Sequence, residues 1–123
     1  MKYNILAEKS YAFSLRATRM YQYLLREKRE FILSKQFERA ATSIGANIEE
    51  GIGALTRKQF ISKMSIAYGE ARETNYWIRL LSDTDYIDPK SGKSMLDDCT
   101  ELLKILTAVL KTAKSRKDGG NTD

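Results

Sequence analysis

The chain has 123 residues and a net charge of +5, with 42% hydrophobic and 30% charged residues, a balance typical of one globular domain. It contains no histidine, which excludes a Glu-x-x-His di-iron site and a Cys-His zinc site and removes the commonest general base; no cofactor is indicated. The lone Cys99 cannot form an internal disulfide, and neither a signal peptide nor a bilayer-spanning apolar run is present, so we expect a cytoplasmic protein.

The first helix is predicted at about residues 4–28 and contains most of the excess positive charge. Residues 1–35 carry eight Lys and Arg against three Glu, which accounts for the whole net charge. The predicted buried stripe of this helix has alternating spacings of four and three residues: Leu6, Ser10, Phe13, Ala17, Met20 and Leu24. Further apolar residues lie off the stripe, which indicates a second contact surface.

The second helix is predicted at about residues 35–52, with Ser34 as its N-cap. Its stripe consists of Phe37, Ala41, Ile44 and Ile48. The residues beside the stripe are small, and small residues allow a neighbouring helix to come close. Gly51 and Gly53 are expected to end this helix or to loosen its last turn.

The third helix is predicted at about residues 57–82, after Thr56 as N-cap, and has the clearest heptad pattern. Its stripe is Phe60, Met64, Ala67, Ala71, Thr74, Ile78 and Leu81. Tyr76 and Trp77 lie off the stripe; we interpret them as packing residues, although aromatic side chains can also stack on nucleobases.

Residues 83–93 are rich in turn-forming residues, and the fourth helix is predicted at about residues 94–114. Its stripe is Met95, Cys99, Leu102, Leu106, Val109 and Ala113. Residues 115–123 contain no apolar side chain and are predicted to be a disordered tail. The sequence therefore predicts an all-α, antiparallel up-and-down four-helix bundle over residues 1–114.

The segment Gln36–Gly51, QFERAATSIGANIEEG, resembles the signature Q-x-x-R-A-A-x-S-I-x-A-N-I-A-E-G. That signature belongs to the bacterial four-helix-bundle family encoded within intervening sequences of 23S ribosomal RNA genes. The matching residues are Gln36, Arg39, Ala40, Ala41, Ser43, Ile44, Ala46, Asn47, Ile48, Glu50 and Gly51. Glu49 replaces the usual Ala. Glu73 keeps an acidic position of the family's third helix, and Glu70 replaces its usual Ser.

The resemblance implies a cytoplasmic bundle, often assembled as a ring-like homopentamer, whose biochemical role is mostly unassigned. The chain is also distantly similar to the accessory protein of diversity-generating retroelements. That protein is a basic pentamer that binds nucleic acid and a reverse transcriptase, but it lacks the clear signature of the second helix.

The polar residues of the signature are interpreted as structural, with Asn47 fixing one packing arrangement. We expect Arg39 or Asn47 to meet Glu50 or Glu73 across the second and third helices, a contact that fixes register more than it adds stability. The structural motif then comprises Gln36, Arg39, Ser43, Asn47, Glu50, Gly51 and Glu73.

Three functions are weighed. The first is a non-catalytic oligomer that binds the backbone phosphates of RNA or DNA. Its candidate contacts are Arg16, Arg19, Arg26, Lys28, Arg29, Arg57 and Lys58. The second is a scaffold without nucleic-acid binding, whose exposed aromatic residues and basic ridge serve a protein partner. The third is an enzyme, for which Glu50 and Glu73 are the only candidate acid–base pair, and we do not favour it.

Overall fold

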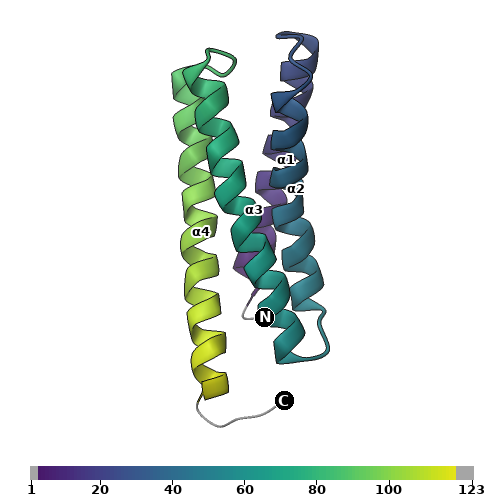
Figure 1. The fold of residues 1–123 in the computed structure, drawn as a ribbon, viewed down its shortest axis with the longest axis vertical. Helices are drawn as coiled ribbons and strands as arrows, with labels where there is room; N and C mark the ends of the chain where they lie inside the picture. The colour runs from purple at the N-terminus through teal and green to yellow at the C-terminus, as the bar shows by residue number, and fades with distance from the viewer. Residues whose placement is uncertain (1–2, 119–123) are drawn as a thin grey trace.

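The computed structural model describes residues 3–118, which form four helices in an up-and-down arrangement (Figure 1). The helices are α1 (Asn4–Arg26), α2 (Leu33–Ile52), α3 (Arg57–Asp83) and α4 (Pro89–Asp118). α2 packs against both α1 and α3, α3 packs against α4, and α1 and α4 contact each other less. The predicted all-α four-helix bundle is therefore confirmed. None of the helices in the described part of the chain is long and apolar enough to cross a membrane.

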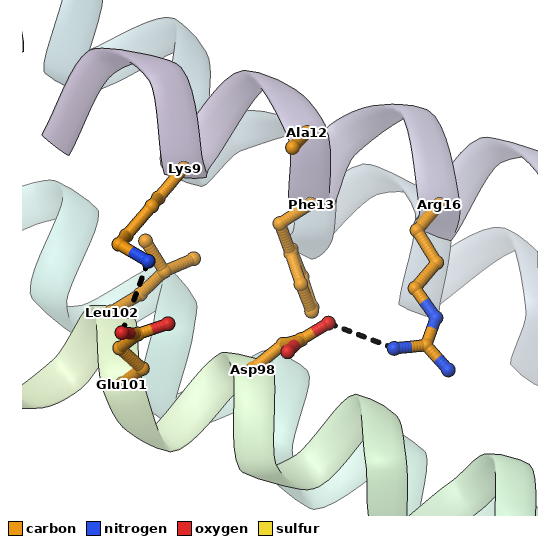
Figure 2. A pocket seen from close by; sticks show the side chains of 7 residues that line it. All are labelled: Lys9, Ala12, Phe13, Arg16, Asp98, Glu101 and Leu102. Atoms are coloured by element: carbon orange, nitrogen blue, oxygen red, sulfur yellow. Dashed lines mark hydrogen bonds and ion pairs between the residues drawn. The ribbon is translucent and has the colours of Figure 1, made fainter. Parts of the chain in front are cut away.

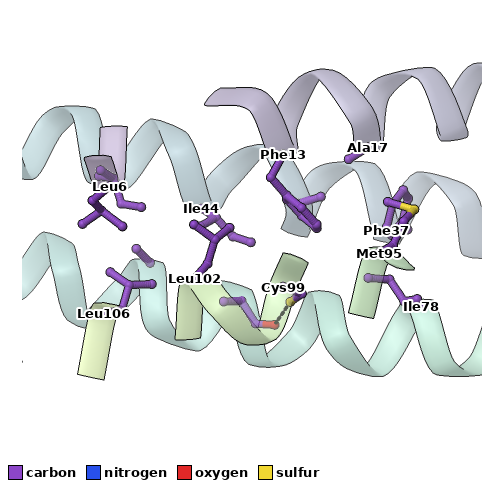
Figure 3. Packing of buried hydrophobic residues seen from close by; sticks show 14 of the residues in the cluster. Leu6, Phe13, Ala17, Phe37, Ile44, Ile78, Met95, Cys99, Leu102 and Leu106 are labelled. Carbon is purple, nitrogen blue, oxygen red and sulfur yellow. Dashed lines mark hydrogen bonds between the residues drawn. The ribbon is translucent and has the colours of Figure 1, made fainter. Parts of the chain in front are cut away.

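The buried core contains the predicted stripes of all four helices (Figure 3). Phe13, Phe37, Ile78 and Leu102 come from α1, α2, α3 and α4 respectively, and each is at most 3% exposed. Met20, Phe60 and Val109 are only partly buried and pack at the edge of this cluster. Periodicity identified the core correctly because an apolar residue every three or four positions defines one helix face.

α1 ends at Arg26 and α2 begins at Leu33, so both bounds differ by two residues from the prediction of 28 and 35. Arg29 has a positive φ of 53°, and the amide of Glu30 donates to the carbonyl of Leu24 over 3.0 Å, which turns the chain back early. Ser34 was wrongly predicted as the N-cap. It lies inside the helix, because the Glu30 carboxylate occupies the capping position.

α4 begins at Pro89, five residues before the predicted start. Asp88 is its N-cap: the carboxylate accepts from the amide of Ser91 over 3.0 Å, and Pro89 follows at the first helical position, where its missing N–H is not needed. Asp85 has a φ of 69° and ends α3, since the amide of Tyr86 donates to the carbonyl of Leu81 over 2.9 Å.

The C-terminal end of α4 also differs from the prediction. Residues 115–118 are helical, so that part of the predicted tail is wrong, and residues 119–123 lie outside the described residues. α4 therefore runs along the full length of the bundle (Figure 1).

The small residues of α2 allow two neighbouring helices to approach closely. A Cβ atom on Gly45 would lie 3.0 Å from Ser14 Oγ of α1. A Cβ atom on Gly51 would lie 3.0 Å from Met64 Cε of α3. Gly53 is the C-cap of α2, as expected, whereas Gly51 is buried in the last helical turn.

Candidate nucleic-acid interface

The seven predicted cations do not form one surface, because the bundle places them at opposite ends. Arg26, Lys28 and Arg29 lie at or next to the α1–α2 connection, whereas Arg57 and Lys58 begin α3 at the other end (Figure 1). A helix of the length of α2 separates these ends by about 30 Å. The sequence could not reveal this separation, because it depends on the antiparallel order of the helices.

Arg16 belongs to the contact between α1 and α4 (Figure 2). Its Nη1 atom lies 2.8 Å from Asp98 Oδ2, and Lys9 Nζ lies 3.1 Å from Glu101 Oε2 one turn away. These two ion pairs bridge a shallow cavity of about 300 Å³ between the helices. The positive charge of Arg16 is therefore matched by a carboxylate, which sets it apart from the other candidates on α1.

The upper basic cluster comprises Arg19, Arg26, Lys28 and Arg29. All four side chains are exposed, and within residues 3–118 none of them forms an ion pair. Arg19 and Arg26 are seven residues apart and therefore lie on one face of α1. Against the two carboxylates of Glu27 and Glu30, the four cations leave residues 19–30 with a net charge of +2.

Glu30, directly after the upper basic cluster, holds the α1–α2 connection in place. Its carboxylate accepts from the backbone amides of Ile32, Leu33 and Ser34 at 3.1, 3.0 and 2.6 Å. Burial alone would raise the pKa of Glu30, but these hydrogen bonds, with a further one from the Ser34 side chain, lower it below the usual value of 4.5. The carboxylate therefore stays ionised. It places Arg29 and Lys28 at the tip of a rigid turn.

The lower basic cluster comprises Arg57, Lys58, Lys114 and Arg116. Arg57 and Arg116 line the same cavity of about 270 Å³, where the start of α3 meets the end of α4. Arg116 was not among the predicted contacts, because it falls in the predicted tail. The signal was present in the composition of α4, because no acidic residue occurs between Glu101 and Arg116 while three basic residues do.

The signature residue Arg39 binds two carboxylates across α2 and α3. Its Nη2 atom donates to Glu73 Oε2 over 2.6 Å, and its two Nη atoms donate to the Glu70 carboxylate over 3.2 and 3.3 Å. The structure thus contains one of the pairs expected from the sequence, Arg39 with Glu73. The cluster lies on the surface, however, since the Arg39 side chain is 48% exposed. The contact between Arg39 and Glu73 is therefore not a buried pair that fixes the register of α2 against α3.

Glu73 also accepts a hydrogen bond from Trp77 Nε1 over 2.9 Å. The bond from Trp77 and the bond from Arg39 together lower the pKa of Glu73, and the two carboxylates raise the pKa of Arg39. Arg39, Glu70, Glu73 and Trp77 thus form one connected polar network, which we call the Arg39 network.

The remaining signature residues have local roles. Glu50 forms an ion pair with Lys63 over 2.7 Å instead of meeting Arg39 or Asn47. Asn47 Nδ2 donates to the carbonyl of Ser43 within α2 over 2.8 Å, and the hydroxyl of Ser43 donates to the carbonyl of Arg39 over 2.7 Å. Gln36 is exposed. Asn47 is only half-buried, so the expectation of a buried packing asparagine is wrong.

The one cysteine is a core residue. Cys99 is fully buried, and its thiol donates to the carbonyl of Ala71 over 3.3 Å. Burial, with a smaller contribution from the neighbouring charge of Asp98, raises the pKa of the thiol to about 12. Cys99 therefore stays protonated at neutral pH and is unsuited to nucleophilic chemistry.

The chain was compared with known families and structures. The sequence profile of the 23S rRNA-intervening sequence protein family matches residues 2–108. A crystal structure of a protein of unknown function from the S23 ribosomal protein family of Bacteroides thetaiotaomicron VPI-5482 is 44% identical. The match covers 90% of this chain and 99% of that one, with a TM-score of 0.88. A search of curated proteins finds no match. The chain therefore belongs to the 23S rRNA-intervening sequence protein family.

Proposed function

We propose that this protein is a non-catalytic homo-oligomer that binds RNA or DNA through its basic surface. The observation that carries the proposal is the upper basic cluster, in which four exposed cations lie together without an ion pair among residues 3–118. Clustered Lys and Arg attract the phosphate backbone and release its counterions.

Oligomerisation strengthens the proposal through multivalency. Several copies of a +5 chain concentrate positive charge on one particle, and linked binding sites gain affinity without new contacts. The N-terminal half of the outer face of α1 favours assembly, because Ile5, Tyr11 and Leu15 are 58%, 64% and 41% exposed. Arg26, Lys28 and Arg29 lie beyond this half. A homopentamer is the assembly that the family resemblance implies.

A filter-binding titration with a structured RNA at low and rising salt tests the proposal. We expect retention at low salt and a linear fall of the logarithm of the binding constant with the logarithm of the salt concentration. Lys28→Gln with Arg29→Gln should reduce the slope by about two units, because each phosphate contact contributes about 0.9.

The matched control is Lys90→Gln with Lys93→Gln. It removes two cations from the start of α4, at the same end of the bundle as Lys28 and Arg29. This variant should keep the wild-type slope, since Lys93 already pairs with Asp97 and the neighbouring connection is acidic. Failure to retain RNA at low salt would contradict nucleic-acid binding. Pull-down from the host with and without nuclease would then test the protein-scaffold alternative.

A further inference from the structure

The solvent-facing side of α3 carries a second stripe, opposite the buried one. Its residues have alternating spacings of three and four and are all exposed: Ser62, Ser65, Gly69, Arg72, Tyr76 and Arg79. We call these six residues the outer stripe. It combines small side chains, two arginines and one tyrosine, and it is about 25 Å long.

Tyr76 is the aromatic centre of the outer stripe and is 49% exposed. Its ring makes an edge contact with Trp77, with centroids 5.0 Å apart and an interplanar angle of 75°. The Arg79 guanidinium lies over the ring, 5.9 Å from its centroid, and Arg79 Nε donates to Asn75 Oδ1 over 2.9 Å. Tyr76 therefore does not pack into the core of the single chain.

The Arg39 network orients this aromatic pair and removes negative charge from its surroundings. Trp77 is held by Glu73, and Glu73 is held by Arg39. Glu70 and Glu73 are the only acidic residues of α3 before Asp83, and both turn toward α2 to bind Arg39. The outer stripe consequently keeps the positive charge of Arg72 and Arg79 without a carboxylate among its members.

Gly69 is a separate indication that something approaches the outer stripe. A Cβ atom at this position would meet nothing within 4 Å, so packing inside the chain does not require glycine. Glycine within a helix costs about 1 kcal/mol relative to alanine. The missing side chain leaves the backbone of α3 open next to Arg72, where a phosphate or sugar could come close.

We infer that the outer stripe binds single-stranded nucleic acid, with a base stacked on Tyr76 and phosphates bound by Arg72 and Arg79. A fixed aromatic ring flanked by arginines is the arrangement that single-strand-binding surfaces use, because every base has a π-face and every linkage a charge. This inference rests on the proposed function and adds to it the strand type and the residue that contacts the base.

Trp77, the only tryptophan of the chain, provides the measurement. A base on Tyr76 lies beside Trp77 and should change its fluorescence. The protein is titrated with oligothymidylate and with an abasic strand of the same length. We expect oligothymidylate to bind about 5- to 100-fold more tightly than the abasic strand, and Tyr76→Ala to abolish that difference.

Two control variants separate stacking from other effects. Tyr76→Phe should keep the preference for oligothymidylate, because stacking needs the ring and not the hydroxyl. Phe31→Ala removes a comparably exposed aromatic ring on the α1–α2 connection and should keep the preference for oligothymidylate. Arg72→Gln should weaken both strands and reduce the salt slope by about 0.7, the contribution of one phosphate contact in a single strand.

The outcomes distinguish the two proposals. Equal affinity for both strands would overturn stacking and leave charge-driven binding intact. No binding of either strand or of structured RNA would overturn both proposals. If Tyr76→Ala changed the solution mass of the protein, the outer stripe would be a contact between copies of the chain, and the inference would be wrong.

Discussion

Among single residues, two carboxylates, those of Glu30 and Glu73, accept hydrogen bonds that connect separate parts of the chain. Glu30 caps α2 from four residues before Ser34, and Glu73 connects Arg39 to Trp77. In both cases an ionised oxygen accepts two or more hydrogen bonds, which are stronger than bonds between neutral groups. The pKa of each carboxyl is lowered as a result.

Glu30→Gln should destabilise the fold by about 1–2 kcal/mol near neutral pH, because it weakens the N-cap of α2. The folded pKa of Glu30 lies below its unfolded value of 4.5, so its contribution is complete above that value and is lost as the pH falls through the folded pKa. Urea unfolding at neutral and acidic pH should therefore show a smaller acid-dependent loss in the variant. Glu27→Gln, which changes an exposed neighbour, is the control; equal losses in both variants would exclude a cap by Glu30.

Glu73→Gln should cost less than about 1 kcal/mol, since Arg39 and Glu73 are both partly exposed and such pairs contribute little. The amide that replaces the carboxylate can still accept from Trp77, so the tryptophan emission should shift only slightly. Urea unfolding followed by this emission measures the free energy. An unchanged melting temperature together with an unchanged oligomer mass would refute a structural role for this contact.

At the level of whole helices, Gly45, Gly51 and Gly92 lie where a neighbouring helix comes close, whereas Gly69 does not. Gly92 at the start of α4 packs on Ser82 near the end of α3, and a Cβ atom there would clash with the Ser82 side chain. Gly69 in the middle of α3 has open space around it. Glycine is therefore needed for helix packing at Gly92, whereas at Gly69 it has no packing role within the chain.

Gly69→Ala and Gly92→Ala should change stability in opposite directions. Gly69→Ala should stabilise the fold by up to about 1 kcal/mol, because alanine is the better helix former and meets no obstacle. Gly92→Ala should destabilise it by about 1–3 kcal/mol, because Ser82 must move. Thermal unfolding of the two variants measures the difference. A loss of stability in Gly69→Ala would show that the helix surface there is already occupied, for instance by another copy of the chain.

At the scale of the whole molecule, the exposed apolar residues and the uneven charge define its interactions. α1 packs on α2 and α4 with one face and leaves Ile5, Tyr11, Leu15 and Tyr23 exposed on the other. The basic clusters lie at the two ends of the bundle, so a ring of copies would carry positive charge on both of its rims.

Leu15→Glu should reduce the solution mass from a multiple of 14.1 kDa to that of one chain, because a charge would be buried in the proposed contact. Light scattering coupled to gel filtration measures this mass. Leu55→Glu is the matched control, since Leu55 is 93% exposed on the α2–α3 connection, away from that face. A wild-type protein that elutes as a single 14.1-kDa chain would contradict assembly through α1.

Local sequence patterns were enough to predict the helices and their buried faces, because a helix repeats every 3.6 residues and the core must be apolar. They also located Thr56 as a cap, whose hydroxyl accepts from the amide of Gln59 over 3.1 Å. The start of α4 was missed, although Asp88 followed by Pro89 is a local signal for a helix start.

Which charges act together depends on the packing of the helices. Arg39 lies 31 and 34 residues from its partners Glu70 and Glu73, and Arg16 lies 82 residues from Asp98. Such contacts depend on which helices are neighbours and on how they are rotated, and neither is encoded in a local pattern. For the same reason, local patterns could not show that six of the predicted cations lie at two opposite ends of the bundle and that Arg16 forms an ion pair. They also could not show that Tyr76 lies on the surface of the chain.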